Sequence, residues 1–313
     1  MSKRFEARPL ASGLTFGVEI VGLRSDDIDD PETQEALRHH WVKDGVLVFR
    51  GLEGAETHLA LSRVFGPLIG HPIQTQDPAR REIMTIRFDP DDAYITEVDG
   101  VPLGAWLPWH SDLVHFDKIN HGGILRPLRL PSRGGETGFI DKIASYDALP
   151  SRLKERIEDL AVVYQFRRDP TEQRFGRNAD VRVLRENKIA LAWKKQTFPF
   201  TLHPMVYTQQ ETGRKMLNVS PWFAIKVDGL APEESDLLLE EIMHYATDAS
   251  RAYFHRWEMG QMVLWDNWRV LHCATGCPAE EERWMERTTI QGDYGLGRFY
   301  DRQGAEEQNQ IEI

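Results

Sequence analysis

The stretch Trp109-His110-Ser111-Asp112 is the most informative part of the sequence. Residues two apart on a β-strand point to the same face, because successive side chains alternate between the two faces. On a strand, the His110 imidazole and the Asp112 carboxylate could therefore reach one metal ion. A lone His-x-Asp pair is common by chance, so a metal site requires a third ligand elsewhere in the chain.

The candidate third ligand is His272, which ends the run Val263-Leu264-Trp265-Asp266-Asn267-Trp268-Arg269-Val270-Leu271-His272. Two histidines and one carboxylate on one side of an ion form the facial triad of non-heme Fe(II) oxygenases. Two of the remaining positions suit a bidentate 2-oxo acid and one suits O2. The same ligands could hold zinc in a hydrolase, although no candidate general base stands at a motif position.

The segments around these residues predict a β-rich fold, because short apolar runs alternate with turn residues. Too few helices separate the strands for a doubly wound parallel sheet. Predicted helices cover Pro31–Asp44, with Asp29 or Asp30 as the cap, Ala55–Phe65, Ser145–Leu160 and Pro232–Thr247. Predicted strands cover Leu14–Leu23, Gly45–Arg50, Ile83–Phe88, Gly123–Leu130, Gly138–Asp141, Ala161–Phe166, Lys215–Val219, Tyr253–Glu258, Gln261–Trp265, Val270–His272 and Thr288–Asp293.

Composition restricts the class of protein. The 313 residues are 41% hydrophobic and 28% charged, which is ordinary for a globular chain. Without a repeat or linker, we expect one domain over residues 1–313, with a core of about 14–293 and a polar tail over 303–313. The net charge of −11 argues against nucleic-acid binding, so any anion site must be built from individual cations.

Targeting signals and cysteine content indicate the compartment. The first residues lack the apolar core of a signal peptide, and no run reaches the roughly 18–20 apolar residues of a membrane span. The chain has two cysteines, too few for a disulfide framework. We therefore expect a cytoplasmic protein that does not bind membranes.

A longer pattern extends the proposed metal site. Ten residues separate His272 from Arg283. A His-x-Asp pair followed by a distant His-x10-Arg resembles the taurine dioxygenase and 2,4-dichlorophenoxyacetate dioxygenase family. Further matches extend the resemblance from about residue 14 to 293: Gly134-Gly135-Glu136-Thr137, Phe65-Gly66-x4-His71-Pro72, His203-Pro204-Met205-Val206-Tyr207-Thr208 and Arg283-x3-Arg287-x-Thr289.

The resemblance implies a mainly β fold, a double-stranded β-helix (a jelly-roll, cupin-like core) with helical insertions. It also implies an Fe(II)- and 2-oxoglutarate-dependent dioxygenase, which uses O2 to hydroxylate a substrate C–H bond and forms succinate and CO2. Because related halogenases lack the carboxylate ligand, Asp112 favours hydroxylation. Members are often oligomers, so we expect a homo-oligomer.

The same resemblance implies how each ligand is held. His110, Asp112 and His272 would bind the iron. Arg283 and Thr137 would bind the distal carboxylate of 2-oxoglutarate, because the planar guanidinium can pair with both carboxylate oxygens. Arg287 would lie near the C1 carboxylate of 2-oxoglutarate and near an anionic group of the substrate, or would serve only the co-substrate or a structural ion pair.

The resemblance further places the substrate. His71 and Arg287 would contact an anionic group, so we expect a small carboxylate, sulfonate or sulfate. His115 replaces an aromatic residue of the family pattern, and Trp222 and Phe223 stand at pocket positions. With Trp106 and Trp109 beside the metal ligands, these residues favour an aromatic or extended substrate over one of taurine's size, unless the tryptophans are simply core.

Two further alternatives remain open from the sequence. The same chemistry could act on a bulky neutral secondary metabolite. A jelly-roll ligand-binding protein could also keep the site without turnover, although pure binding does not need the open positions of a redox metal. The basic pair Arg167-Arg168 is interpreted as solvated surface.

Overall fold

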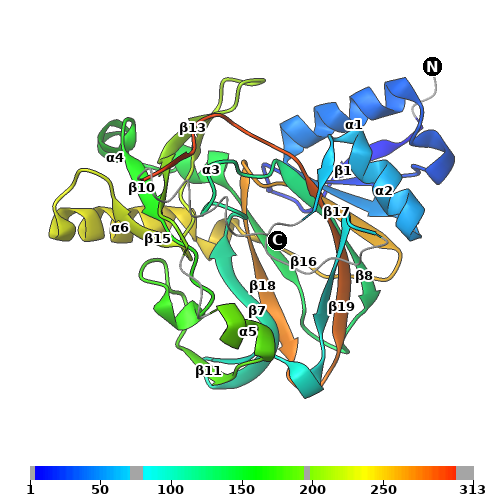
Figure 1. The fold of residues 1–313 in the computed structure, drawn as a ribbon. Helices are drawn as coiled ribbons and strands as arrows, with labels where there is room; N and C mark the ends of the chain where they lie inside the picture. Colours follow the sequence, from blue (N-terminus) through cyan, green and yellow to red (C-terminus); the bar gives the residue numbers. More distant parts are fainter. Residues whose placement is uncertain (1–3, 71–79, 194–197, 301–313) are drawn as a thin grey trace.

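The computed structural model describes residues 4–70, 80–193 and 198–300, and two β-sheets form its centre (Figure 1). The strands of the larger sheet, in spatial order, are β1 (Glu6–Pro9), β2 (Val18–Val21), β3 (Val46–Arg50), β17 (Gln261–Asp266), β8 (Gly122–Arg129), β19 (Arg283–Ile290) and β4 (Leu68–Ile69), and β5 (Ile83–Phe88) also pairs with β19. The smaller sheet contains β11 (Val181–Arg185), β6 (Ile95–Val98), β7 (Val101–His110), β18 (Val270–Pro278), β9 (Thr137–Asp141) and β16 (Tyr253–His255).

Helix α1 (Pro31–Asp44) has clear signals at both ends. The Asp30 side chain accepts a hydrogen bond from the Thr33 amide at 2.9 Å, which confirms one of the two expected caps. Gly45 follows the last turn with a φ of 74°, a conformation that costs glycine little. Together with α2 (Ala55–Val64), α1 packs on the outer face of the larger sheet (Figure 1).

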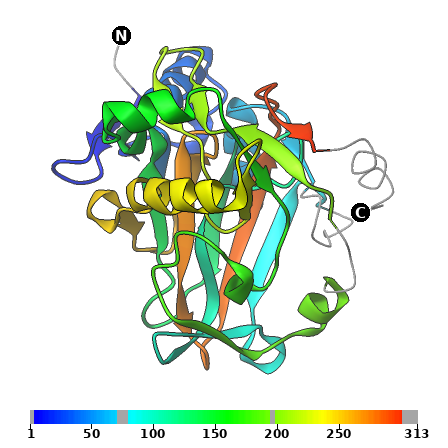
Figure 2. The ribbon, with the colours of Figure 1, turned by 90° about the vertical axis from the view of Figure 1, so that its left-hand side faces the viewer.

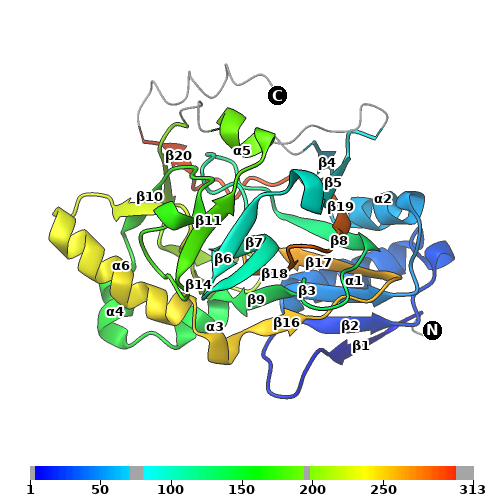
Figure 3. The ribbon, with the colours of Figure 1, turned by 90° about the horizontal axis from the view of Figure 1, so that it is seen from below.

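Strands β3 and β17 are buried on both faces, which explains their continuous apolar runs. Val48 and Trp265 point into an apolar cluster shared with Phe139 and Val270 of the smaller sheet. The side chains that alternate with these along β3 and β17 point to the opposite face of the sheet and pack under α1 and α2. That second cluster contains Leu37, Leu47, Phe49, Leu61 and Leu264. The two sheets therefore face each other across a packed core, as the view from below shows (Figure 3).

In the described part of the chain, two small sheets and four more α-helices surround this core. One sheet has β15 (Ala224–Val227), β10 (Ala161–Tyr164), β12 (Thr201–Pro204) and β20 (Arg298–Phe299), and the other has β13 (Val206–Thr208) and β14 (Lys215–Leu217). The helices are α3 (Lys142–Asp147), α4 (Ser151–Ile157), α5 (Lys188–Trp193) and α6 (Pro232–Ala246). Helix α6 contacts β15 and α3 (Figure 2). This arrangement confirms the predicted mainly β jelly roll with helical insertions.

Several predicted elements have other bounds than expected. The helix expected at Ser145–Leu160 is two helices, because Pro150 has no amide hydrogen and disfavours helical backbone in the residue before it. The strand expected at Leu14–Leu23 is confined to β2, which begins after Gly17 at a φ of 79°. The strand expected to begin at Thr288 begins at Arg283, so β19 carries both arginines of the family pattern.

Some sequence predictions fall where the structure gives no description. His71 and the tail at 303–313 lie outside the described residues. In the ranges that are described, the helices are too short or too polar to traverse a bilayer.

Candidate metal centre and substrate cavity

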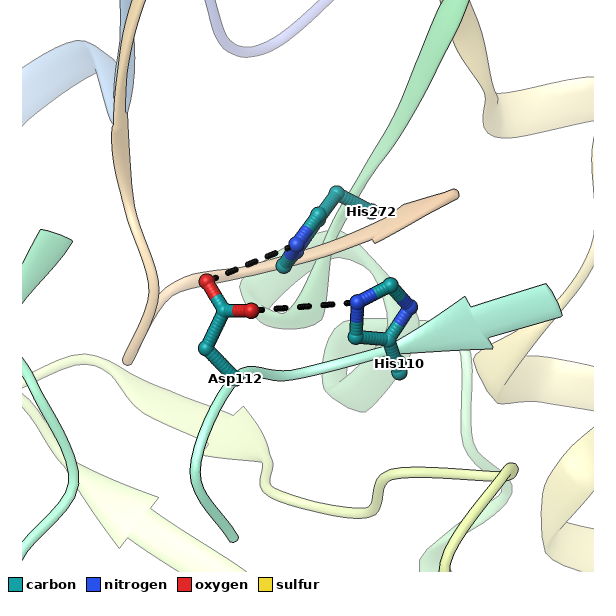
Figure 4. A group of neighbouring side chains, drawn as sticks. All are labelled: His110, Asp112 and His272. Atoms are coloured by element: carbon teal, nitrogen blue, oxygen red, sulfur yellow. Dashed lines mark ion pairs between the residues drawn. The ribbon is translucent and has the colours of Figure 1, made fainter. Parts of the chain in front are cut away.

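The three predicted ligands lie together in the fold. His110 and His272 are opposite each other in the antiparallel pair β7–β18, with ring centroids 4.2 Å apart. Asp112 Oδ1 lies 3.8 Å from His110 Nε2, and Asp112 Oδ2 lies 3.5 Å from His272 Nε2 (Figure 4). All three residues are buried, and one ligand atom from each lies within 4.8 Å of the others. Strand pairing thus brings together residues far apart in sequence.

The expected reason for the His-x-Asp geometry is wrong in one respect. Strand β7 ends at His110, so Asp112 lies in the following turn and not on the strand. Leu113 has a φ of 56°, an uncommon conformation for a residue with a side chain. The turn, and not strand alternation, directs the carboxylate back toward the two imidazoles.

Asn267 holds this turn in place. Its side-chain oxygen accepts a hydrogen bond from the Asp112 amide at 2.8 Å, and its side-chain nitrogen donates to the Asp112 carbonyl at 3.1 Å. Asn267 is fully buried and also donates to Asn120. Because the amide and the carbonyl of Asp112 are both hydrogen-bonded to one side chain, the backbone from which the carboxylate projects is held in one position. The sequence contained no signal for this role.

The protonation states suit a cation. His110 Nδ1 lies 2.7 Å from the Pro108 carbonyl, which can only accept, so Nδ1 carries the proton and Nε2 keeps its lone pair toward Asp112. Burial, with His272, lowers the pKa of His110 to about 3. Burial alone raises the pKa of Asp112, but Arg287 and His272 outweigh it and hold that pKa well below its usual value. The lone pair of His110 and the ionised carboxylate of Asp112 are the kinds of donor that Fe(II) takes in a facial triad.

Arg287 is bound to the triad carboxylate. Its Nη2 lies 2.7 Å from Asp112 Oδ2, and its Nη1 lies 3.3 Å from Oδ1. The guanidinium also lies over the Trp265 ring, 4.9 Å from its centroid. The structure therefore places Arg287 beside the proposed metal position, where its charge neutralises Asp112. A contact with a ligand anion stays a prediction.

Arg283 is a buried cation with room for an anion. It is 5% exposed, its Nη2 donates to the Gly135 carbonyl at 3.2 Å, and its Nε has no hydrogen-bond partner among the described residues. No ion pair joins it to a carboxylate in the described ranges. A Cβ at Gly135 would lie 3.1 Å from Arg283 Nε, and Gly135 has a φ of 77°. The Gly134-Gly135 turn therefore makes space for this guanidinium.

Thr137 lies at the start of β9 and lines a cavity that Arg283 also lines. Its hydroxyl oxygen accepts a hydrogen bond from Trp257 Nε1 at 3.0 Å. With that oxygen already accepting, the hydroxyl hydrogen can be donated to an oxyanion. Trp257 is a further site residue that the sequence did not mark.

One cavity of about 330 Å³ joins these groups. Its lining includes the triad, Thr137, Arg283 and Arg287, together with several aromatic side chains. Trp222 is stacked on Phe223 at 4.7 Å and meets His110 edge-on at 5.4 Å. His115 lies beside Phe223, at 5.4 Å between ring centroids. The predicted pocket residues described by the structure therefore surround the triad.

The two other tryptophans have different environments. Trp106 lines the cavity, whereas Trp109 is packed in an apolar cluster and contacts Phe254. The core alternative thus holds for Trp109. The interpretation of Arg168 as solvated surface was wrong, because this residue is half-buried and lines the cavity. Neither an apolar run nor a metal-binding motif marked Arg168 in the sequence, because this residue lies in a segment that connects two elements.

Known proteins resemble the chain over nearly its whole length. The model of the "Taurine catabolism dioxygenase TauD, TfdA family" matches residues 6–289. The chain belongs to this family. Members are α-ketoglutarate-dependent dioxygenases that require Fe(II), 2-oxoglutarate and O2, so this TauD/TfdA-family protein is an enzyme of that class.

Individual relatives support the assignment. The (S)-phenoxypropionate/α-ketoglutarate dioxygenase of Sphingobium herbicidovorans is 31% identical over 94% of this chain and 97% of its own. The α-ketoglutarate-dependent 2,4-dichlorophenoxyacetate dioxygenase of Cupriavidus pinatubonensis is also 31% identical, over 92% and 98%. The crystal structure of a taurine dioxygenase from Burkholderia xenovorans superposes with a TM-score of 0.73 at 24% identity, covering 98% of this chain and 99% of that one. The last comparison shows the fold.

Proposed function

We propose that His110, Asp112 and His272 hold the iron of this dioxygenase and that its substrate is a small anion with a flat, aromatic body. The main support is the buried triad, whose ligand atoms converge on one side of a cavity that also contains Arg283. When bound, Fe(II) supplies the redox chemistry that couples oxidation of 2-oxoglutarate to succinate and CO2 with hydroxylation of the substrate. The protein supplies position, charge and a sheltered cavity.

Arg283 and Thr137 are the proposed site for the distal carboxylate of 2-oxoglutarate. A buried guanidinium is costly unless an anion lies beside it, and Arg283 has only a carbonyl partner in the described residues. Burial lowers the pKa of Arg283, yet an arginine stays charged at neutral pH. The Thr137 hydroxyl can donate a second hydrogen bond to the same carboxylate. Arg287 is proposed to keep Asp112 ionised and oriented.

The aromatic walls of the cavity support a flat substrate. Trp222, Phe223 and Trp106 provide faces on which an aromatic ring can lie, which aliphatic side chains would not offer to the same degree. The relatives named above act on phenoxypropionate and 2,4-dichlorophenoxyacetate, which are both aromatic carboxylates. Together these observations favour an aromatic carboxylate over a bulky neutral metabolite, with a sulfonate or sulfate as related choices.

The same proposal extends to the organisation of the protein. We expect one catalytic domain over about residues 14–293, supported by the family match over residues 6–289. A homo-oligomer and a cytoplasmic location stay predictions. Light scattering after gel filtration tests the first of these, and cell fractionation tests the second.

Substrate-dependent succinate formation tests the proposal. Purified enzyme with Fe(II), ascorbate and 2-oxoglutarate is offered aryloxyalkanoates, alkoxybenzoates, arylsulfonates, sulfate esters and neutral polycyclic compounds. We expect an aromatic anion to stimulate succinate release and His110→Ala to abolish it. Stimulation by a neutral compound alone would overturn the proposed substrate class. Unchanged turnover in His110→Ala would overturn the proposed iron ligands.

A further inference from the structure

The metal turn (residues 111–113), which carries Asp112, is held from two sides. On one side, Asn267 bonds to the amide and the carbonyl of Asp112, as described above. On the other side, the Ser111 amide donates a hydrogen bond to Ser220 Oγ at 3.0 Å. Both serines are buried, so water does not compete for this bond. Because Ser111 lies between His110 and Asp112, the bond fixes the backbone between two proposed iron ligands.

Ser220 lies in the segment that forms an aromatic wall of the cavity. It belongs to the connection between β14 and β15 and precedes Trp222 and Phe223, which both line the cavity. Pro221 separates Ser220 from Trp222, and its ring fixes φ, so few backbone conformations are open to these residues. Residues 220–223, the wall segment, are therefore expected to move as a unit. The hydrogen bond between Ser111 and Ser220 joins this segment to the metal turn.

The wall segment is anchored on its other side as well. The Ser220 amide donates to the Tyr164 hydroxyl at 3.1 Å, and the Gln165 amide donates to the Phe223 carbonyl at 3.1 Å. Tyr164 ends strand β10 and is buried. The amide and the hydroxyl of Ser220 thus bond to different parts of the fold, β10 and the metal turn. A shift of the wall segment must lengthen one of these bonds.

The metal turn depends on such contacts, because its backbone is not relaxed. Leu113 has a φ of 56°, and a residue with a side chain keeps that conformation only where its surroundings enforce it. Trp222 and Phe223 also meet the His110 ring, at centroid distances of 5.4 and 6.3 Å. Such ring contacts constrain direction weakly, whereas a hydrogen bond to a backbone amide constrains both distance and angle. The hydrogen bond is therefore the better candidate for a positional link.

We propose that Ser220 is a positioning residue that couples the aromatic wall of the cavity to the metal turn. The proposal rests on the proposed function, since it takes His110 and Asp112 as iron ligands, and it adds a residue that touches neither iron nor substrate. Coupling of this kind is reciprocal: a bound metal should hold the wall segment still, and loss of the link should weaken metal binding. A substrate that lies on Trp222 and Phe223 then acts on the triad through Ser220.

Metal binding and hydrogen exchange, measured on the same variants, test this coupling. Co(II) is the probe, because its visible absorption bands change with the arrangement of its ligands. Its affinity is measured for wild type, Ser220→Ala, Ser220→Thr and Ser235→Ala, and amide exchange is followed by mass spectrometry with and without Co(II). Ser235 on α6 is the matched control: it is buried, its Oγ accepts a hydrogen bond from the Val227 amide at 2.8 Å, and it does not line the cavity.

In wild type, we expect Co(II) to slow amide exchange in both the metal turn and the wall segment. Ser220→Ala should lower Co(II) affinity about 3- to 10-fold, the effect of one neutral hydrogen bond, and shift the absorption bands. In this variant Co(II) should still protect the metal turn but no longer the wall segment. Ser220→Thr keeps the hydroxyl and should restore most of both effects. Ser235→Ala should lose stability and keep wild-type Co(II) affinity.

Three results would overturn the coupling. One is exchange in the wild-type wall segment that does not respond to Co(II). Another is full protection of that segment by Co(II) in Ser220→Ala, which would assign the link to the contact of Trp222 with His110. The third is an equal loss of Co(II) affinity in Ser220→Ala and Ser235→Ala, which would indicate general destabilisation. Unchanged Co(II) binding in His110→Ala is a separate result, because it would overturn the proposed iron ligands themselves.

Discussion

The two ends of the cavity are built differently. At the iron end, His110 and His272 are partners in one register of paired strands, and Arg283 and Arg287 lie on a third strand, β19. At the proposed substrate end, Trp222 and Phe223 lie in the connection between strands β14 and β15. Strands of the core hold atoms to the precision that metal binding requires, whereas connections can change without disturbing the sheets. We therefore expect the reaction class to depend mainly on the sheets and substrate choice to depend on the connections.

The largest expected effect is the loss of succinate release when a histidine at the iron end is replaced. His272→Ala removes a proposed iron ligand, so both substrate-stimulated and substrate-free succinate release should fall by more than the roughly 100-fold that loss of an outer partner costs. Assays with saturating Fe(II) measure this. His244→Ala on the exposed face of α6 is the control and should keep wild-type rates. Substantial turnover in His272→Ala would place the iron elsewhere.

Arg283→Ala should affect the co-substrate and spare the metal. Loss of charge-assisted hydrogen bonds to the distal carboxylate should raise the KM for 2-oxoglutarate about 10- to 100-fold, while Fe(II) affinity stays near wild type. Initial rates over a range of 2-oxoglutarate concentrations give the KM. Arg129→Ala serves for comparison, because Arg129 is exposed and pairs with Glu282. An unchanged KM in Arg283→Ala would remove Arg283 from the co-substrate site.

Asn267→Ala tests whether the iron end depends on a fixed turn. Without the clamp, both Asp112 backbone groups lose their partner, and Fe(II) affinity should fall about 10- to 100-fold. Metal titration and thermal unfolding are measured together. Asn218→Ala is a matched buried asparagine that bonds to the Pro204 carbonyl and not to the triad turn. It should lower stability and keep Fe(II) affinity. Equal affinity losses in both variants would indicate a general packing effect.

Replacement of Lys142 should give the smallest effect, which is a change in the free energy of unfolding. It is buried beneath the iron end, where its Nζ lies 3.3 Å from the Asn267 carbonyl, and burial lowers its pKa to about 7 against the opposing charge of Asp266. Between this pKa and the ordinary lysine value, the unfolded chain holds a proton that the folded chain lacks. Stability from this group therefore increases as pH increases in that window.

The difference in unfolding free energy between wild type and Lys142→Met measures this contribution. It should change by roughly 1 kcal/mol per pH unit above pH 7, in favour of wild type at higher pH. Denaturant unfolding at several pH values gives the difference. A difference that is independent of pH would mean that Lys142 has the same pKa in the folded and unfolded chains.

The contrast between the ends also explains what the sequence could predict. The two histidines and the two arginines lie on paired strands, and Asp112 follows His110 by two residues in the next turn, so a motif located them. The clamp by Asn267 and the hydrogen bond from Trp257 depend on contacts between distant segments, which no local pattern encodes. Arg168 resembled any surface arginine, because only the fold shows that its connection passes the cavity.

The secondary-structure predictions show the same difference between local signals and contacts between distant segments. Helix α1 and strand β5 have the predicted bounds, since their caps and apolar runs are local signals. Strand β7 was not predicted along its whole length, because it contains two prolines and a glycine and is only partly buried. The turn at Leu113 was missed because its positive φ occurs in a residue that rarely adopts it.

Binding of 2-oxoglutarate without O2 tests the central claim most directly. Calorimetry compares wild type, Asp112→Ala and Arg283→Ala, each with and without Fe(II). The account predicts tight binding only in wild type with Fe(II), loss of the iron dependence in Asp112→Ala, and weakened but still iron-dependent binding in Arg283→Ala. Equal binding with and without Fe(II) in wild type, or unchanged iron-dependent binding in Asp112→Ala, would contradict a site that spans the triad and Arg283.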